Sequence, residues 1–134
     1  MFKWLKKEII IGIFFGLLYL GIELLYRGHT HWTMFLLGGL VSILIGLINE
    51  ITPKMNIFVQ MFIGTLIITF LELVFGYILN IKLGLCIWDY SNVPFNFLGQ
   101  ICLPFSFIWF ILSYPIILLD DILKKYLKFN IKLK

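Results

Sequence analysis

The fold is decided by residues 33–79, TMFLLGGLVSILIGLINEITPKMNIFVQMFIGTLIITFLELVFGYIL. This stretch contains two apolar runs, residues 33–51 and 57–79, which are joined only by the short sequence TPKMN. A helix needs about 20 apolar residues to cross a hydrocarbon layer of about 30 Å. Each run is long enough to span a membrane, and the short connection, which contains Pro53, predicts two adjacent transmembrane helices joined by a tight turn.

Two further apolar runs, residues 8–26 and 98–119, flank this pair. The chain of 134 residues is 61% hydrophobic and only 13% charged, whereas a soluble domain is about 45–50% apolar and about 25% charged. The sequence therefore predicts an all-α membrane protein with four transmembrane helices in a single domain, residues 1–134, multi-pass in the plasma membrane. The first run is too long for the apolar region of a signal peptide, and we expect it to be retained.

The basic residues predict the orientation of these spans. Nine of them fall on one side, before the first span, between the second and third, or after the fourth: Lys3, Lys6, Lys7, Lys54, Lys124, Lys125, Lys128, Lys132 and Lys134. Only Arg27 and Lys82 fall on the other side. Because basic residues favour the cytoplasmic side, both termini are expected to be cytoplasmic. The basic cytoplasmic tail, residues 120–134, suits an anionic inner leaflet, so the expected partner is the lipid bilayer and not nucleic acid.

Each predicted span also carries small or polar residues at helical spacing. The first span has Gly12 and Gly16, the second has Gly38, and the fourth has a polar face of Gly99, Cys102, Ser106, Trp109 and Ser113. Small residues let membrane helices approach closely. Helix packing is therefore the expected role of most of these positions.

Carboxylates at or inside the spans call for a partner or a function, since an ionisable residue at a helix centre costs about 2.5–3.5 kcal/mol on insertion scales. Glu23 precedes Arg27 by four residues, the favourable order for an ion pair on one helix face, and this pair could be structural or functional. Glu72 lies well inside the third span, beyond reach of any basic residue of its own helix. Glu50 ends the second span, where an exposed carboxylate is expected.

Glu72 could meet Arg27, His29 or His31 from the first outer connection, YRGHTHWTM, or could itself be protonated.

Histidines and cysteines offer weaker signals. His29 and His31, with a carboxylate, could hold a divalent metal, but two histidines at a membrane surface more commonly form hydrogen bonds. We therefore expect no metal and no cofactor, and two cysteines do not make a disulfide framework.

The second outer connection, residues 80–97, is long for a compact helical bundle, and such loops are often functional. It is also rich in large apolar side chains, so we expect it to be partly inserted into the outer mouth of the bundle. Irregular backbone at that depth needs polar partners, which Asp89, Tyr90 and Asn96 can supply. Asp89 could pair with Arg27 or His31. Trp88 and Tyr90 could instead belong to an interfacial aromatic belt.

Three segments, YRGHTHWTMFLLGG, FLELVFG and WDYSNVPFNFLGQICLPFSFIWF, resemble the CmpB-like, or putative ABC-transporter type IV, family of small bacterial membrane proteins. The resemblance extends from Glu23 to Trp109 and is most specific at Trp88, Asp89, Tyr90, Ser91, Pro94, Asn96, Gly99, Gln100, Ile101, Cys102 and Leu103. It implies a permease. The chain itself contains no P-loop motif.

Three functional hypotheses follow from these patterns. The first is a permease-like or transport-associated protein that binds a small polar or cationic solute, or a lipid headgroup, at an outer-leaflet site. That site comprises Glu23, Arg27, His31, Glu72, Trp88, Asp89, Tyr90, Asn96 and Gln100. The second is an intramembrane enzyme acting on a lipid, with Glu72 and Asp89 as an acid–base pair. The third is a structural or regulatory subunit. Four short helices enclose little volume, so we expect a homo-oligomer or a larger membrane complex.

Overall fold

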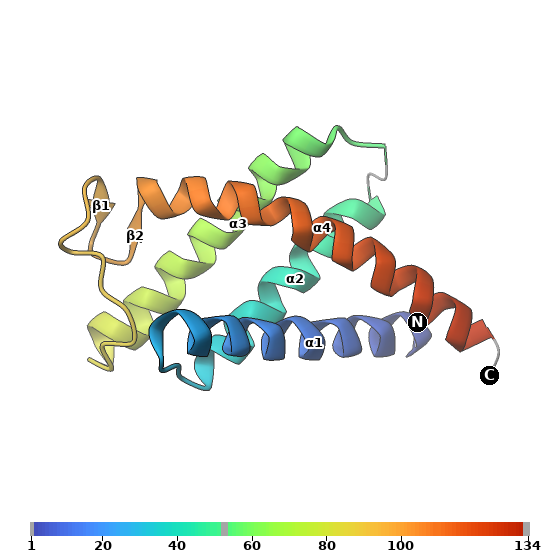
Figure 1. Ribbon diagram of the computed structural model, residues 1–134, viewed down its shortest axis with the longest axis horizontal. Coiled ribbons are helices and arrows are strands. Elements are labelled where there is room, and N and C mark those ends of the chain that lie inside the picture. Colours follow the sequence, from blue (N-terminus) through green and yellow to red (C-terminus); the bar gives the residue numbers. More distant parts are fainter. Residues whose placement is uncertain (1, 52–53, 133–134) are drawn as a thin grey trace. The chain divides into compact units, whose positions relative to one another are not determined.

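The computed structural model describes residues 2–51 and 54–132 and contains four long helices (Figure 1). These are α1 (Phe2–Arg27), α2 (Thr33–Ile51), α3 (Ile57–Gly76) and α4 (Leu103–Lys132). A π-helical segment, η1 (Tyr77–Lys82), continues α3, and two short strands, β1 (Asn96–Phe97) and β2 (Ile101–Cys102), precede α4. The prediction of an all-helical chain with four helices is confirmed, and the bounds of α2 are those predicted. The expected turn at Pro53 lies outside the described residues.

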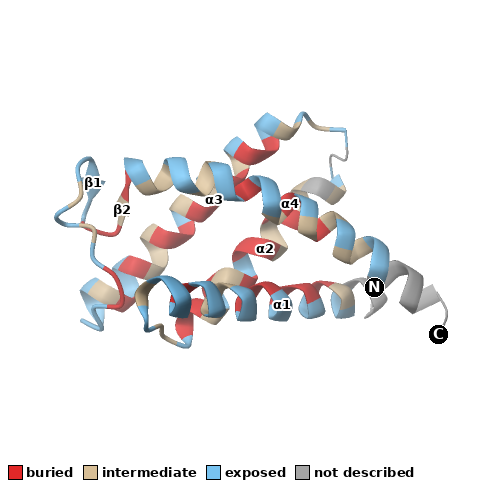
Figure 2. Cartoon of the chain, viewed as in Figure 1, coloured by how far each residue is buried: buried red, intermediate tan, exposed pale blue. Residues whose placement is uncertain are grey.

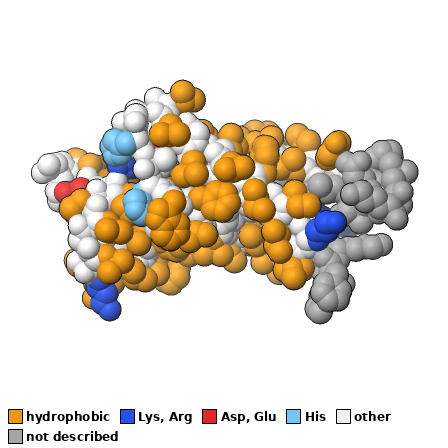
Figure 3. Space-filling view, turned by 90° about the horizontal axis from the view of Figure 1, so that it is seen from below, with side chains coloured by type: hydrophobic (Ala, Val, Ile, Leu, Met, Phe, Trp, Pro, Cys, Tyr) orange, Lys and Arg blue, Asp and Glu red, His pale blue; other side chains and the backbone are white. Residues whose placement is uncertain are grey.

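Three helical stretches are long and apolar enough to cross a membrane: Leu5–Arg27, Ile57–Lys82 and Leu103–Tyr126. The apolar part of α2, Thr33–Ile48, is shorter than these. Large hydrophobic side chains are exposed along all of these helices, and they cover most of the face seen in Figure 3. Because such a surface is unfavourable in water, the chain is a membrane protein.

The chain divides into two compact units, one made of Met1–Lys54 with Pro115–Lys134 and the other of Met55–Tyr114. In the first unit, α1 packs against α2 through glycines. A Cβ at Gly16 would lie 2.7 Å from the backbone oxygen of Phe35, and one at Gly39 would lie 2.8 Å from that of Gly12. The close helix approach expected from the small residues is therefore present, and buried positions recur along the helices in Figure 2.

In the second unit, the start of the last helix differs from the prediction. The fourth span was expected from residue 98, whereas α4 begins at Leu103. Leu98 and Gly99 have φ angles of 56° and 71°, which a right-handed helix does not allow. Residues 96–102 instead form a hairpin, in which Asn96 pairs with Cys102 and Phe97 with Ile101.

The ends of the other helices also differ from the prediction. The third span continues past residue 79 as η1 to Lys82, and α1 begins at Phe2 rather than near residue 8. The segment after residue 119 is a continuation of α4 as far as Lys132. Residues 120–132, which were predicted to form a separate tail, therefore belong to α4.

Candidate functional site

Glu72 lies on α3, in the second unit, with only 5% of its surface exposed. Its two carboxylate oxygens accept hydrogen bonds from two different segments. The Tyr90 hydroxyl donates to Oε2 at 3.0 Å, and the Trp109 Nε1–H donates to Oε1 at 3.0 Å. One carboxylate therefore connects α3 with the loop before β1 and with α4.

The loop that carries Tyr90 is held by its own polar groups. The backbone N–H of Tyr90 donates to the Gly99 oxygen at 2.7 Å, and the Tyr90 ring stacks on Phe105 with centroids 4.7 Å apart. Asn96 donates to the Val93 oxygen at 2.9 Å and accepts from the Gly99 N–H at 3.1 Å. Asn96 therefore shapes the turn that presents Tyr90 to Glu72.

Asp89 is exposed and turned to its own loop. Its Oδ1 accepts the backbone N–H of Ser91 at 2.8 Å. This bond holds the pKa of the Asp89 carboxyl below its usual value, because it stabilises the charged form. Asp89 thus closes a local turn two residues long, an arrangement common for Asp in loops.

Gln100 and Trp88 form a second buried network beside α3. Gln100 accepts a hydrogen bond from Asn80 Nδ2 at 2.8 Å, and its backbone oxygen accepts one from Trp88 Nε1 at 3.0 Å. Asn80 also accepts the Ile87 N–H at 2.7 Å. A Cβ at Gly76 would lie 2.6 Å from Gln100 Oε1, so a glycine is needed there for the loop to pack against α3.

At the end of α1, in the first unit, Glu23 is buried and makes the ion pair expected from its spacing. Arg27 Nη1 lies 3.0 Å from Glu23 Oε2, and the Thr30 hydroxyl donates to Oε1 at 3.1 Å. His31 Nδ1 lies 2.7 Å from the Thr33 hydroxyl. Among residues 2–51 and 54–132, no group of three His, Cys, Asp or Glu side chains could hold a metal ion.

The predicted site residues thus fall into separate groups. Glu72 and Tyr90 meet directly, Trp88 meets Gln100, and Asp89 and Asn96 shape the loop. Glu23, Arg27 and His31 belong to the other unit, and a contact between them and Glu72 stays a prediction. Trp109 was missed as a site residue, although it was recognised on the polar face of the fourth span.

A group of charged residues at the other end of the first unit was also missed. We call it the Lys124 cluster, and it consists of Lys7, Glu8, Glu50, Asp120 and Lys124. The Lys124 ammonium lies 3.1 Å from Asp120 Oδ2, 3.2 Å from Glu50 Oε1 and 3.7 Å from Glu8 Oε1, and it donates to the Gly46 oxygen at 2.9 Å. Lys7 lies 3.1 Å from the same Glu50 oxygen. Glu50 is therefore a half-buried, doubly paired group, not the exposed helix-end carboxylate that was expected.

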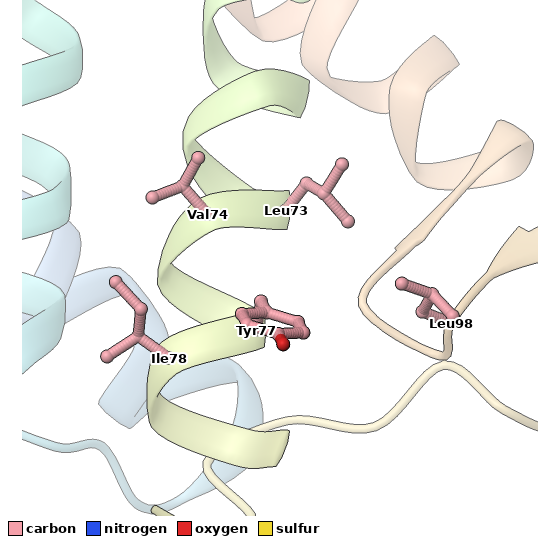
Figure 4. Close-up of a pocket in the computed structure, with 5 residues that line it drawn as sticks. All are labelled: Leu73, Val74, Tyr77, Ile78 and Leu98. Carbon is pink, nitrogen blue, oxygen red and sulfur yellow. The ribbon is translucent and has the colours of Figure 1, made fainter. Parts of the chain in front are cut away.

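A shallow apolar groove of about 320 Å³ lies on the surface of the second unit (Figure 4). Leu73, Val74, Tyr77 and Ile78 line it from α3 and η1, and Leu98 faces them from the hairpin. The groove is separate from the two hydrogen bonds of Glu72. Its apolar lining suits a hydrocarbon chain and not a polar solute.

Comparison with known proteins identifies the family of the chain. No solved structure matches the chain. A model of the family described as "Putative ABC-transporter type IV" matches residues 9–133, which is nearly the whole chain and includes Glu72, the loop and the Lys124 cluster except Lys7 and Glu8. The chain therefore belongs to the putative ABC-transporter type IV family.

Proposed function

We propose that this protein takes part in membrane transport and that Glu72 binds a small cationic solute or a cationic lipid headgroup. In this proposal the chain is a multi-pass protein of the plasma membrane with both termini in the cytoplasm. Residues 27–32 and the loop 83–102 then lie on the outer side. The family and the apolar helices support a transport-associated membrane protein, and the chemistry of Glu72 supports the finer assignment.

The observation that carries the proposal is the pair of neutral donors on Glu72. Among the described residues no ion pair involves Glu72, and its hydrogen bonds come from a phenol and an indole. Each of the two oxygens accepts one hydrogen bond from a neutral donor, and a carboxylate oxygen can accept more than one. Glu72 therefore retains acceptor capacity for a cation, which would also supply the opposite charge that a carboxylate within a span needs.

The remaining predicted residues have supporting roles. Asn96 and Asp89 set the shape of the loop, and Gln100 and Trp88 anchor it to α3. In the proposed arrangement, Glu23, Arg27 and His31 lie at the same outer side, where Arg27 contacts an anionic group such as the phosphate of a lipid headgroup. A homo-oligomer or a larger complex would supply the volume that one chain lacks, and an ATPase subunit would supply the P-loop.

A second candidate is a structural or regulatory subunit. It is favoured by the way in which Glu72 joins three segments of the second unit. The lipid-enzyme alternative has less support, because Asp89 is engaged with Ser91 in its own turn and no contact between Asp89 and Glu72 is present among the described interactions.

Binding of tetramethylammonium and choline to the full chain in nanodiscs, measured by calorimetry, tests the proposal. Glu72→Gln keeps the size of the side chain and should abolish binding. Thr69→Val is the matched control, since it is a nearly isosteric change one turn earlier on the same helix and touches only a weak contact of 3.4 Å with Ser106. Equal binding by the wild type and Glu72→Gln would refute the assignment, and a loss of stability without any binding by the wild type would favour the structural role.

A further inference from the structure

The apolar groove of the second unit has two walls that are tied to each other. Leu73 of α3 and Tyr77 of η1 point across it toward Leu98 of the hairpin (Figure 4). Asn80 of η1 donates a hydrogen bond from Nδ2 to Gln100 Oε1 at 2.8 Å, and Gln100 Nε2 donates one to the Leu98 oxygen at 3.0 Å. The groove is therefore preformed, as most small-molecule sites are.

Leu98 holds a backbone conformation that its residue type does not favour. Its φ angle is 56°, in the left-handed region that is uncommon for residues other than glycine, and its side chain is half-exposed. Glycine or asparagine would adopt this conformation more readily. The backbone thus gives no reason for a leucine here, and what this residue contributes is the apolar wall of the groove opposite α3.

The π-helical turn places a lysine beside the same groove. In η1 the backbone N–H of Leu83 donates to the Ile78 oxygen, five residues earlier, at 3.0 Å. Residues five apart in an α-helix lie about 140° from each other around the axis, whereas in a π-helix they lie nearly in line. Accordingly the Lys82 ammonium lies 5.9 Å from the centre of the Tyr77 ring, which lines the groove.

Lys82 is free to pair with an external anion. Its side chain is exposed, and it makes no ion pair within residues 2–51 and 54–132. The apolar stretch long enough to cross a membrane, Ile57–Lys82, ends at this lysine. A cation at the end of a span lies at the level of the lipid headgroups, so an apolar groove with a lysine at its end complements a lipid that has a hydrocarbon chain and an anionic phosphate.

We propose that this groove binds one acyl chain of an anionic phospholipid, whose phosphate contacts Lys82. The volume of about 320 Å³ is at the low end of the range of about 300–1,000 Å³ for small-molecule sites, which suits one chain and not a whole lipid. The lysine charge favours an anionic lipid over a zwitterionic one. The site goes beyond cation binding at Glu72, whose donors Tyr90 and Trp109 do not line the groove.

Native mass spectrometry of the full chain tests the proposal. The protein is extracted in detergent and incubated with equal amounts of phosphatidylglycerol and phosphatidylcholine that carry the same acyl chains. We expect one lipid to stay bound, with phosphatidylglycerol preferred about fivefold, which is the effect of one lysine on an anionic lipid. Lys82→Gln should remove this preference and still bind a lipid. The matched control Lys54→Gln changes an exposed lysine three residues before α3 and should keep both the lipid and the preference.

A second pair of variants tests the apolar wall. Leu98→Asn removes the wall and keeps the backbone, because asparagine adopts the left-handed conformation readily, and it should release both lipids. Its matched control is Phe95→Asn, since Phe95 is also left-handed, with a φ angle of 57°, and exposed, but does not line the groove. If Leu98→Asn does not fold, Leu73→Phe fills the groove from the opposite wall, and Leu66→Phe, two turns earlier on the same helix face, is its control.

Several results would overturn the proposal. They are a wild type that retains no lipid, a lipid retained equally by Leu98→Asn and Leu73→Phe, and a preference for phosphatidylglycerol that is unchanged in Lys82→Gln. A lipid-free wild-type dimer that Leu98→Asn dissociates would also overturn it, by assigning the groove to a second copy of the chain. Glu72→Gln should leave lipid binding unchanged, so a failure of this site is distinguishable from a failure of cation binding at Glu72.

Discussion

Replacing Lys124 by Met removes the ammonium that three carboxyl groups share while keeping a side chain of similar length. At an effective dielectric constant of about 20, one unit pair at the 3.1 Å separation of Lys124 and Asp120 attracts by about 5 kcal/mol. Part of this lost attraction is offset, because the folded protein no longer has to bury a charged ammonium. Removal of one partner from a buried pair costs about 3–5 kcal/mol overall, and we expect a loss of that size in the free energy of unfolding.

The assay is reversible unfolding of the reconstituted protein, followed by circular dichroism. Lys125→Met is the matched control, because Lys125 is the next residue on α4 and is exposed, and it should change stability by no more than about 0.5 kcal/mol. Adding Asp120→Asn to Lys124→Met should recover part of the loss, since it removes one of the stranded charges. A loss below about 1 kcal/mol, the range of exposed ion pairs, would refute the reasoning that the cluster is a buried site.

Three further predictions concern the second unit. Trp109→Phe leaves one oxygen of the buried Glu72 without its donor and should cost about 1–3 kcal/mol, measured by chemical unfolding; an unchanged stability would contradict the hydrogen bond. Gly76→Ala forces a Cβ to within 2.6 Å of a buried amide oxygen and should cost about 1–3 kcal/mol, whereas Gly21→Ala, which meets nothing within 4 Å, should not destabilise the same preparation. The pKa of Asp89 is lowered in the folded loop. Its contribution to the stability of the loop is therefore complete above the ordinary pKa of about 3.9 and is lost as the pH falls through the lower pKa of the folded state. Hydrogen exchange of the loop amides should show this loss in the wild type and not in Asp89→Asn.

The helices were largely predictable from sequence, and the hairpin before α4 was not. The ends of α2 are marked by a polar Thr33 and by a change of composition after Ile51, so both bounds agree with the structure. Near residue 98, in contrast, apolar residues lie on both sides of Gly99 and Gln100, so composition does not mark where the helix begins. The left-handed conformations of Phe95 and Leu98 are uncommon for such residues and depend on the pairing of β1 with β2, which composition does not reveal.

The site was predictable only in part for a similar reason. The importance of a carboxylate at position 72 follows from its cost in an apolar run, but its donors lie 18 and 37 residues away in sequence. In the Lys124 cluster only Asp120 and Lys124 share a helix face at a spacing of four. Glu8 and Glu50 join them through tertiary packing, which no local pattern encodes.

The long separation of Glu72 from Trp109 has a consequence for the order in which the protein is made. Chains are synthesised at about 5–20 residues per second, so Trp109, which lies 37 residues after Glu72, is added about 2–7 seconds after Glu72. Lys124, which pairs with Glu50 at 3.2 Å, emerges later still. The last helix supplies a partner to Glu72 and to Glu50, so a nascent chain halted before α4 lacks one partner for a carboxyl group in each unit.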